Sequence, residues 1–372
     1  MLKARLKNEL QNIPGWRTSR KLVVFESDDW GMIRMASKAA YERLEKKGHP
    51  VAGCPFNRND ALENNADMQL FAEALLSVRD SNDRPAKFTL NNVVANPDFE
   101  RIRESGFTRY SHESFTQTLA RYPDSDRVLD HYREGLRSGL FSLQFHGREH
   151  IQVRHWLEAL RAKNPLFADA FNEHMATQSA GPRSSCRIEC LDGMGAYSEE
   201  DQRFIEQSVA EGLDLFQQIW GFRAASVIAP CYTWRSDLEQ TWQEQGIRYI
   251  QSGRAQGVPR PGEQRVGLKR HWMGRRNALG QVITVRNAVF EPSMDPSRDW
   301  AGSCLRQIAS AFRWRKPAVI SSHRLNFIGS IRPANRDSGL RQLRALLDEI
   351  VRRWPEVEFL GSEELGECIA AD

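Results

Sequence analysis

The sequence has no long hydrophobic run. No window in its 372 residues approaches the roughly 18 consecutive apolar residues that a membrane-spanning helix needs. The first 25 residues are charged and amphipathic, and they lack both the apolar core and the small-residue cleavage site of a secretory signal. We therefore expect a chain that is not exported and has no membrane partner.

Cysteine is scarce, and the cysteines show no clear metal-binding pattern. Cys186 and Cys190 lie four positions apart, but no second Cys or His pair follows at zinc-finger spacing, so we do not expect a structural zinc site there. Without an export signal, reduced thiols and a cytoplasmic location are expected. The six cysteines are Cys54, Cys186, Cys190, Cys231, Cys304 and Cys368.

An excess of one charge is also missing. The sequence has 52 basic and 48 acidic residues, a net charge of +4. This balance argues against a dedicated nucleic-acid-binding protein. Basic residues do gather between 254 and 276, where Glu263 is the only acid. This segment is expected to be a solvated loop, with a surface for an anionic glycan as the functional alternative. Its basic members are Arg254, Arg260, Arg265, Lys269, Arg270, Arg275 and Arg276.

No repeat and no Gly/Ser linker divides the chain, so the length fits two domains or one large barrel. Short apolar runs with strand character alternate with amphipathic helical patterns. Such alternation predicts parallel βαβ units, and about seven of them favour a barrel. The predicted strands cover 21–27, 86–94, 140–145, 224–230, 247–252, 281–287, 317–323 and 357–361. The predicted helices cover 35–47, 67–78, 111–119, 127–137, 199–220, 238–245, 299–314 and 339–354.

Polar residues follow several predicted strands at their carboxyl ends, where the active sites of such barrels lie. The first strand leads into Asp28 and Asp29. Adjacent carboxylates repel each other unless a cation neutralises one of them. The alternative is structural, since Asp is common in turns and at the start of helices.

The predicted strand 140–145 leads into the sequence His146-Gly-Arg-Glu-His150. Two histidines at i and i+4 share one face of a helical turn and can reach one metal ion. Glu149 precedes the second histidine instead of following the first, so this is not the HExxH motif of metalloproteases. A carboxylate from the Asp pair would complete a three-ligand site with an open position. A surface helix with two histidines is the other interpretation.

Two further strand ends carry candidate residues. Pro230 follows an apolar run and could simply terminate a strand. His323 comes directly after the predicted strand 317–323, where it is either a proton donor or a buried structural histidine.

Taken in this order, these motifs resemble the polysaccharide deacetylase family, the family-four carbohydrate esterases. The resemblance implies an α/β fold, a distorted seven-stranded parallel β/α barrel in a single domain with helical insertions. Residues 20–372 would form the barrel after an N-terminal extension, 1–19. The resemblance also implies roles for individual residues, with Asp28 the catalytic base, His323 the general acid, and Asp29, His146 and His150 the metal ligands.

Two family motifs depart from the expected pattern. The third motif, Arg-x-Pro-Tyr, has Ile228 in place of Arg and Cys231 after the proline. The backbone N–H of Cys231 can still serve the oxyanion, whereas the missing guanidinium must come from elsewhere, with Arg148 and Arg286 as candidates. The fourth motif, an Asp-Trp pair, is approximated by residues 299–300 after Asp295.

The segment 151–198 is longer than a βα connection requires, and we expect either a lid over the site or a helical hairpin beside it. Asn287 and Glu291 follow another predicted strand and could face the site.

The sequence thus predicts a metal-dependent hydrolase that removes an N-acetyl or other N-acyl group from an amino sugar or a polysaccharide precursor. The expected cofactor is a divalent metal, with Zn²⁺ the first choice, and the expected partner is a carbohydrate, anionic or neutral. One alternative is a glycosidase that uses a carboxylate pair such as Asp28 and Glu291. Another is a non-catalytic sugar-binding barrel. The oligomeric state is left open.

Overall fold

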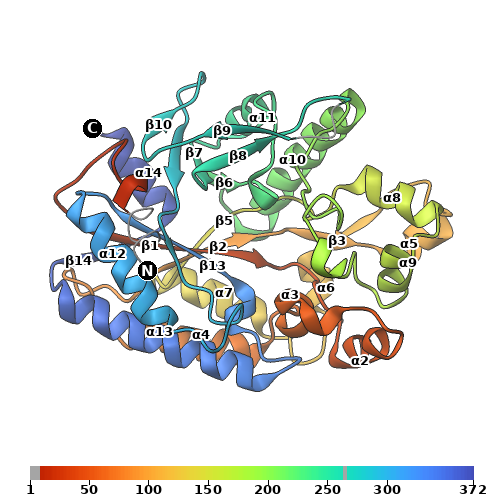
Figure 1. The fold of residues 1–372 in the computed structure, drawn as a ribbon, viewed down its shortest axis with the longest axis horizontal. Helices are drawn as coiled ribbons and strands as arrows, with labels where there is room; N and C mark the ends of the chain where they lie inside the picture. Colours follow the sequence, from red (N-terminus) through yellow and green to blue (C-terminus); the bar gives the residue numbers. More distant parts are fainter. Residues whose placement is uncertain (1–8, 263–265) are drawn as a thin grey trace.

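The computed structural model describes residues 9–262 and 266–372. These residues form one mixed α/β domain, in which helices surround a mostly parallel sheet (Figure 1). The strands follow one another in the order β10-β11-β7-β6-β5-β2-β1-β13-β12, and β14 also pairs with β1. Their bounds are β1 (Lys21–Trp30), β2 (Phe88–Asn92), β5 (Phe141–Phe145), β6 (Ser226–Ile228), β7 (Tyr249–Ser252), β10 (Arg275–Arg276), β11 (Val282–Val285), β12 (Ala288–Val289), β13 (Ala318–His323) and β14 (Val357–Leu360).

The two ends of the parallel sheet meet in the segment that contains β11 and β12. β11 pairs with β7, and β12 pairs with β13. Between them, the Arg286 N–H donates to the Ser252 carbonyl at 2.9 Å, and the Asn287 N–H donates to the Val319 carbonyl at 3.0 Å. The segment 282–289 therefore bridges both edges of the sheet, which agrees with the predicted distorted barrel of seven parallel strands.

Helices pack around this sheet, and most of them lie where the sequence predicts. α10, the long α13 and α4 are among those that cover the strands (Figure 1). The helix bounds are α2 (Lys38–Lys46), α3 (Pro55–Asn59), α4 (Asn65–Leu75), α5 (Phe99–Glu104), α6 (Phe115–Leu119), α7 (Val128–Arg137), α8 (Val153–Arg161), α9 (Pro165–Asn172), α10 (Glu199–Trp220), α11 (Leu238–Glu244), α12 (Trp300–Arg313), α13 (Pro333–Arg353) and α14 (Ser362–Ala370).

An aromatic cluster fixes α4 against the first strands. Phe25 of β1 stacks on Phe88 of β2 with ring centroids 4.4 Å apart. Phe71 of α4 meets Phe88 edge-on at 5.0 Å and stacks on Phe327 at 4.6 Å. All four rings are fully buried, and each such side chain stabilises the fold by about 1.5–3 kcal/mol through burial alone. This packing holds β1, whose carboxyl end carries the candidate site.

Two hairpins differ from the prediction. Residues 112–114 are strand β4 (His112–Ser114), not helix, because they pair with β3 (Ala95–Pro97). Much of the basic segment 254–276 is the antiparallel hairpin of β8 (Ala255–Val258) and β9 (Gly267–Arg270). Glu263 and Arg265 of that segment, like residues 1–8 of the predicted extension, lie outside the described residues.

The expectation of reduced thiols is wrong for one pair of cysteines. Cys186 and Cys231 form a disulfide across 45 residues of sequence. The pair arises because the chain after α9 folds back over the turn that follows β6, which brings the two Cα atoms to 6.5 Å. The free cysteines of the described chain are Cys54, Cys190, Cys304 and Cys368.

Among the described residues, no helix combines the length and the apolar character that crossing a membrane requires.

Candidate metal centre and active site

The first strand is longer than predicted, and its last residues build the site. β1 continues through Asp28 and Asp29 to Trp30, and its pairing with β2 shifts between Ser27 and Trp30. Asp29 has a φ of 75°, a left-handed conformation that is uncommon outside glycine. The Trp30 indole N–H donates to the Ser27 hydroxyl at 2.9 Å and spans this irregularity. The bulge thus sets the directions of two adjacent carboxylates.

Asp29, His146 and His150 lie together as one buried cluster. Their candidate ligand atoms are all within 4.8 Å of one another. Asp29 Oδ1 is 3.4 Å from His146 Nε2 and 3.5 Å from His150 Nε2. Two imidazoles and one carboxylate at these distances match the ligand set of a catalytic zinc site, which keeps a further position open.

The two histidines do not share a helical turn, contrary to the sequence prediction. They follow β5 in an irregular segment, and Gly147 between them has a φ of 114°, which a residue with a side chain rarely adopts. Their rings still lie 4.9 Å apart. The glycine turn brings both imidazoles to Asp29.

Hydrogen bonding and burial prepare these side chains for a cation. His146 Nδ1 contacts the Ile228 carbonyl at 2.9 Å, which directs its Nε2 toward Asp29, as backbone carbonyls commonly do for metal-bound histidines. Burial, together with the neighbouring His146, lowers the pKa of His150 to about 4 although Asp29 opposes this. Burial acts to raise the pKa of Asp29, but the nearby imidazoles outweigh it and keep that pKa well below its usual range. A neutral histidine and an ionised carboxylate are the forms that bind metal.

Arg286 forms a bidentate ion pair with the other carboxylate, Asp28. Its Nη1 and Nη2 each lie 2.7 Å from one Asp28 oxygen, and its Nε donates to Glu26 at 2.7 Å. Burial disfavours the charge on Asp28, but Arg286 more than compensates and lowers its pKa. Asn91 Nδ2 also donates to Asp28 Oδ1 at 2.8 Å. Asp28 is therefore ionised and fixed in direction.

His323 lies at the end of β13, directly beside Asp28 in the strand register. Its Nε2 is 3.9 Å from Asp28 Oδ2, and its Nδ1 contacts Glu291 Oε1 at 2.6 Å. Burial disfavours the imidazolium, but Glu291 and the two aspartates outweigh this and raise the pKa of His323 to about 10. The second Glu291 oxygen accepts from Asn326 Nδ2 at 2.7 Å. His323 is thus held protonated by a carboxylate that is itself held in place.

Cys231 lies in the short turn that follows β6 and precedes α11. Its φ is 55° and that of Tyr232 is 52°, so two successive residues are left-handed. The disulfide to Cys186 joins this turn to the segment after α9. The Tyr232 hydroxyl accepts from Arg286 Nη1 at 3.2 Å, so the turn borders the Asp28 side of the site.

Of the two arginines that could replace the missing guanidinium, only Arg286 contacts Asp28. Arg148 Nε donates to Glu149 at 2.6 Å, and its Nη1 donates to Glu211. Asn287 hydrogen-bonds to Asn12 and to backbone groups at the start of β13. It therefore stabilises the junction of β11 and β12 with β13.

The Asp-Trp pair at 299–300 has structural contacts. Asp299 caps α12 by accepting from the Gly302 N–H at 2.8 Å, and the Trp300 indole donates to the Asp295 carbonyl at 2.9 Å. The carboxylate that contacts His323 is Glu291.

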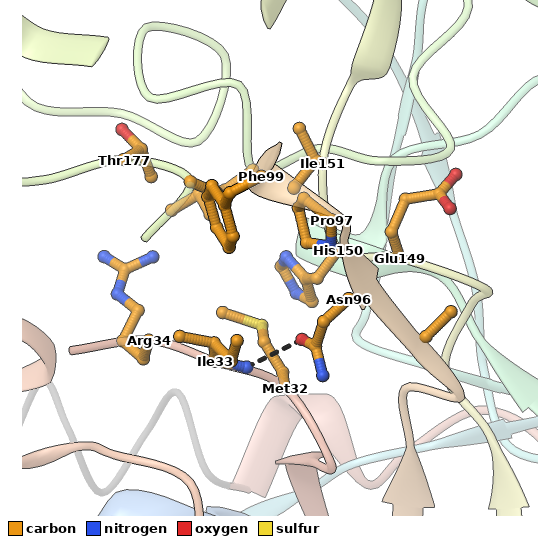
Figure 2. Close-up of a pocket in the computed structure, with 13 residues that line it drawn as sticks. Met32, Ile33, Arg34, Asn96, Pro97, Phe99, Glu149, His150, Ile151 and Thr177 are labelled. Atoms are coloured by element: carbon orange, nitrogen blue, oxygen red, sulfur yellow. Dashed lines mark hydrogen bonds between the residues drawn. The ribbon is translucent and has the colours of Figure 1, made fainter. Parts of the chain in front are cut away.

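Three residues near the cluster were not identified from the sequence. Arg34 lines a pocket together with His150 (Figure 2). Its guanidinium carbon lies 5.5 Å from the ring centroid of Phe56, and that ring meets the His323 ring edge-on at 5.3 Å. Glu189, in the long segment after α9, approaches Arg34 at 3.3 Å. One arginine among many carries no sequence signal, and only the fold brings these residues together.

Comparisons with known proteins gave similarities of structure only. No family model and no curated protein matches the sequence. A structure described as a polysaccharide deacetylase, from Mycobacterium smegmatis, is 12% identical with a TM-score of 0.44 and covers 96% of this chain and 93% of that chain. One described as a glycoside hydrolase/deacetylase, from Parabacteroides distasonis, is 9% identical with a TM-score of 0.48 and covers 95% and 72%.

The 4-alpha-glucanotransferase from Thermococcus litoralis is 12% identical with a TM-score of 0.45; the match covers 93% of this chain but 40% of that longer one. Several deacetylases are thus among the solved structures that match nearly the whole chain.

Proposed function

We propose that the protein is a metal-dependent hydrolase that removes an N-acetyl or other N-acyl group from an amino sugar or a polysaccharide precursor. The observation that carries the proposal is the meeting of three groups at the carboxyl ends of the strands. They are the Asp29-His146-His150 cluster, the Asp28–Arg286 pair and the His323–Glu291 pair. A ligand set, an ionised base and a protonated acid are what amide hydrolysis requires.

The cluster of Asp29, His146 and His150 would hold a divalent ion, for which Zn²⁺ is the expected choice. When bound, such an ion polarises a carbonyl and lowers the pKa of water toward neutrality. The neutral state of His150 and the ionised state of Asp29 favour binding.

Asp28 acts as the general base. Its pKa is lowered by Arg286, so it is ionised at neutral pH and ready to accept the proton of the attacking water. Because Arg286 binds both Asp28 oxygens, the carboxylate cannot rotate away from the water. We assign the oxyanion contact to the backbone N–H of Cys231, whose strained turn follows β6.

His323 acts as the general acid. Glu291 keeps its imidazole protonated, and its Nε2 lies 3.9 Å from Asp28 Oδ2, so one reacting group could contact both the acid and the base. The acid donates its proton to the departing amine as the C–N bond breaks. In the predicted cytoplasmic location, the substrate would be a precursor or imported material.

The two alternatives lose support from these contacts. Both oxygens of Glu291 are engaged, by His323 and Asn326, and Asp28 is paired with Arg286, so neither carboxylate suits a glycosidase acid. The non-catalytic alternative depended on a missing arginine, and Arg286 supplies a guanidinium to Asp28.

The test combines a metal assay by emission spectroscopy with a screen for acetate release over N-acetylated glycans. Wild type should carry a divalent metal and release acetate in a chelator-sensitive reaction. His146→Ala should lose both, whereas His174→Ala, at an exposed histidine paired with Glu100, should lose neither. If His146→Ala kept stoichiometric metal and full turnover, the proposal would be wrong.

A further inference from the structure

The hairpin of β8 and β9 lies beside the turn that contains Cys231. The Trp234 N–H, shortly after this turn, donates to the carbonyl of Gly257 in β8 at 3.0 Å. Beyond β8, the Gly262 N–H donates to the Tyr197 carbonyl at 3.3 Å. The hairpin follows the carboxyl end of β7, so it lies at the same end of the sheet as the candidate active site.

One face of this hairpin packs on the protein, and the other is exposed. Alternate residues of a strand point to opposite faces. Gln256 is buried, and its Nε2 donates to the Trp234 carbonyl at 2.9 Å. Lys269 lies opposite Gln256 in the strand register, and its neighbours Leu268 and Arg270 are exposed. The inner face of the hairpin is therefore occupied by the fold, whereas the outer face is open to solvent.

Arginine, aromatic and aliphatic side chains adjoin one another on the outer face. The Arg275 guanidinium carbon lies 4.6 Å from the ring centroid of Trp272, and the Arg275 Nη1 donates to the Arg270 carbonyl at 2.6 Å. Trp272 is still 40% exposed, and Leu268 is 78% exposed. We call this set the hairpin surface: Leu268, Arg270, Trp272 and Arg275. It combines two guanidinium groups with apolar surface that the fold leaves uncovered.

The positive charge of the hairpin surface is not neutralised within the described part of the chain. The described residues of the basic segment include no Asp or Glu, and no described carboxylate pairs with Arg270 or Arg275. Arg235, by contrast, contacts two carboxylates at 2.8 and 2.7 Å. Lys269, on the inner face, lies 3.7 Å from Glu239. An unpaired guanidinium is suited to a carboxylate ligand, which it binds with two parallel hydrogen bonds.

We propose that the hairpin surface binds a polysaccharide chain that carries carboxylate groups. Arg270 and Arg275 bind the carboxylates, and Trp272 and Leu268 contact the apolar C–H faces of the sugar rings. This inference rests on the proposed function and narrows its substrate class to acylated polysaccharides that carry a negative charge. The hairpin surface holds the polymer outside the reacting site, and its charge also raises the rate of encounter with an anionic chain.

Binding to the full chain tests this without any requirement for turnover. The probes are polygalacturonate oligosaccharides, neutral dextran oligosaccharides of the same length and a single-stranded DNA of similar charge, each titrated by calorimetry at two ionic strengths. Wild type should bind polygalacturonate in preference to both other probes, and more weakly at the higher ionic strength. The double variant Arg270→Gln/Arg275→Gln should weaken this binding by about tenfold or more. Trp272→Ala should weaken it at both ionic strengths, because it removes the ring contact.

A matched double variant removes the same charge elsewhere on the surface. Arg352 and Arg353 both pair with Glu349 on α13, and Arg352→Gln/Arg353→Gln should leave the affinity within about a factor of two. An equal loss in the two double variants would show attraction by net charge alone. That result, DNA binding as tight as polygalacturonate binding, or a wild type that binds no polygalacturonate overturns the inference.

Failure of this inference and failure of the proposed function can be told apart. If wild type releases acetate equally well from neutral and carboxylated N-acetylated polysaccharides, and Arg270→Gln/Arg275→Gln changes neither reaction, the hydrolase stands and the role of the hairpin surface falls. If polygalacturonate binds through Arg270 and Arg275 but no acylated sugar is hydrolysed, the reverse holds. With an active wild type, this double variant should raise KM for a carboxylated polymer more than it changes kcat.

Discussion

Arg286 binds Asp28 with two parallel hydrogen bonds of 2.7 Å, across 258 residues of sequence. The same guanidinium donates to Glu26 through Nε. Three charges are therefore buried together at the end of β1. Because the guanidinium is planar and its donors are fixed, it sets the direction of the proposed base as well as its charge.

Replacing Arg286 with Lys should lower kcat by about 100-fold, because an ammonium cannot hold both Asp28 oxygens and small displacements of a base are costly. Metal content should not change, since Arg286 is not among the proposed ligands. Steady-state kinetics and a metal assay measure the two quantities. The more drastic Arg286→Leu should destabilise the fold by about 3–5 kcal/mol, because it leaves two buried carboxylates unpaired.

A matched control lies at the other end of the same strand. Arg20 binds Glu358 with two bonds of 2.7 Å, and this pair is partly exposed. Arg20→Lys should leave kcat within a factor of two or so, since exposed pairs contribute little. An equal loss of kcat in both variants would contradict a specific role for Arg286.

Replacing Glu291 with Gln should move the alkaline limb of the kcat/KM profile to lower pH. Glu291 stabilises the imidazolium of His323, whose pKa is raised to about 10, so loss of the carboxylate lowers that pKa and the acid is lost earlier as pH rises. An unchanged limb would show that His323 is not the acid.

Stability should follow the same titration. The pKa of His323 is higher in the folded protein than the 6.5 of an unperturbed histidine, so its contribution to stability is complete below pH 6.5 and is lost as pH rises toward 10. Urea unfolding at pH 6, 8 and 10 should show this decline, and Glu291→Gln should reduce it.

Much of this site could be predicted because its residues stand at strand ends. Apolar runs that stop at Asp28, His146 and His323 are visible in the sequence, and parallel strands bring their carboxyl ends together. The sequence left two candidates for the arginine that replaces the missing guanidinium, because nothing in the local sequence distinguishes Arg286 from Arg148. The geometry of Gly147 was missed because spacing alone suggests a helical turn.

Other features depend on contacts between distant segments, for which the sequence carries no signal. Arg34 meets Glu189 across 155 residues, and Cys186 meets Cys231 only because the insertion folds over the turn after β6. The pair at 299–300 has the residue types of the fourth motif, but its side chains cap and support α12.

Removing the disulfide should lower the free energy of unfolding by about 3–4 kcal/mol, because it closes a loop of intermediate length. Cys186→Ser is the variant and urea unfolding without reductant the measurement. Adding dithiothreitol should bring wild type to the level of the variant. Cys368→Ser, at a free and half-buried cysteine, should have little effect. If wild type unfolds identically with and without reductant, the disulfide does not stabilise the fold.

The central claim is that adjacent carboxylates at the end of β1 have separate tasks, and a paired comparison of Asp28→Asn with Asp29→Asn tests it most directly. Metal content and acetate release are measured on both variants. Asp28→Asn should keep the metal and lose turnover by about 10²–10⁴-fold, because only the base is removed. Asp29→Asn should lose metal and turnover together. An Asp29→Asn protein with full metal content, or an Asp28→Asn protein with unchanged turnover, would contradict the account.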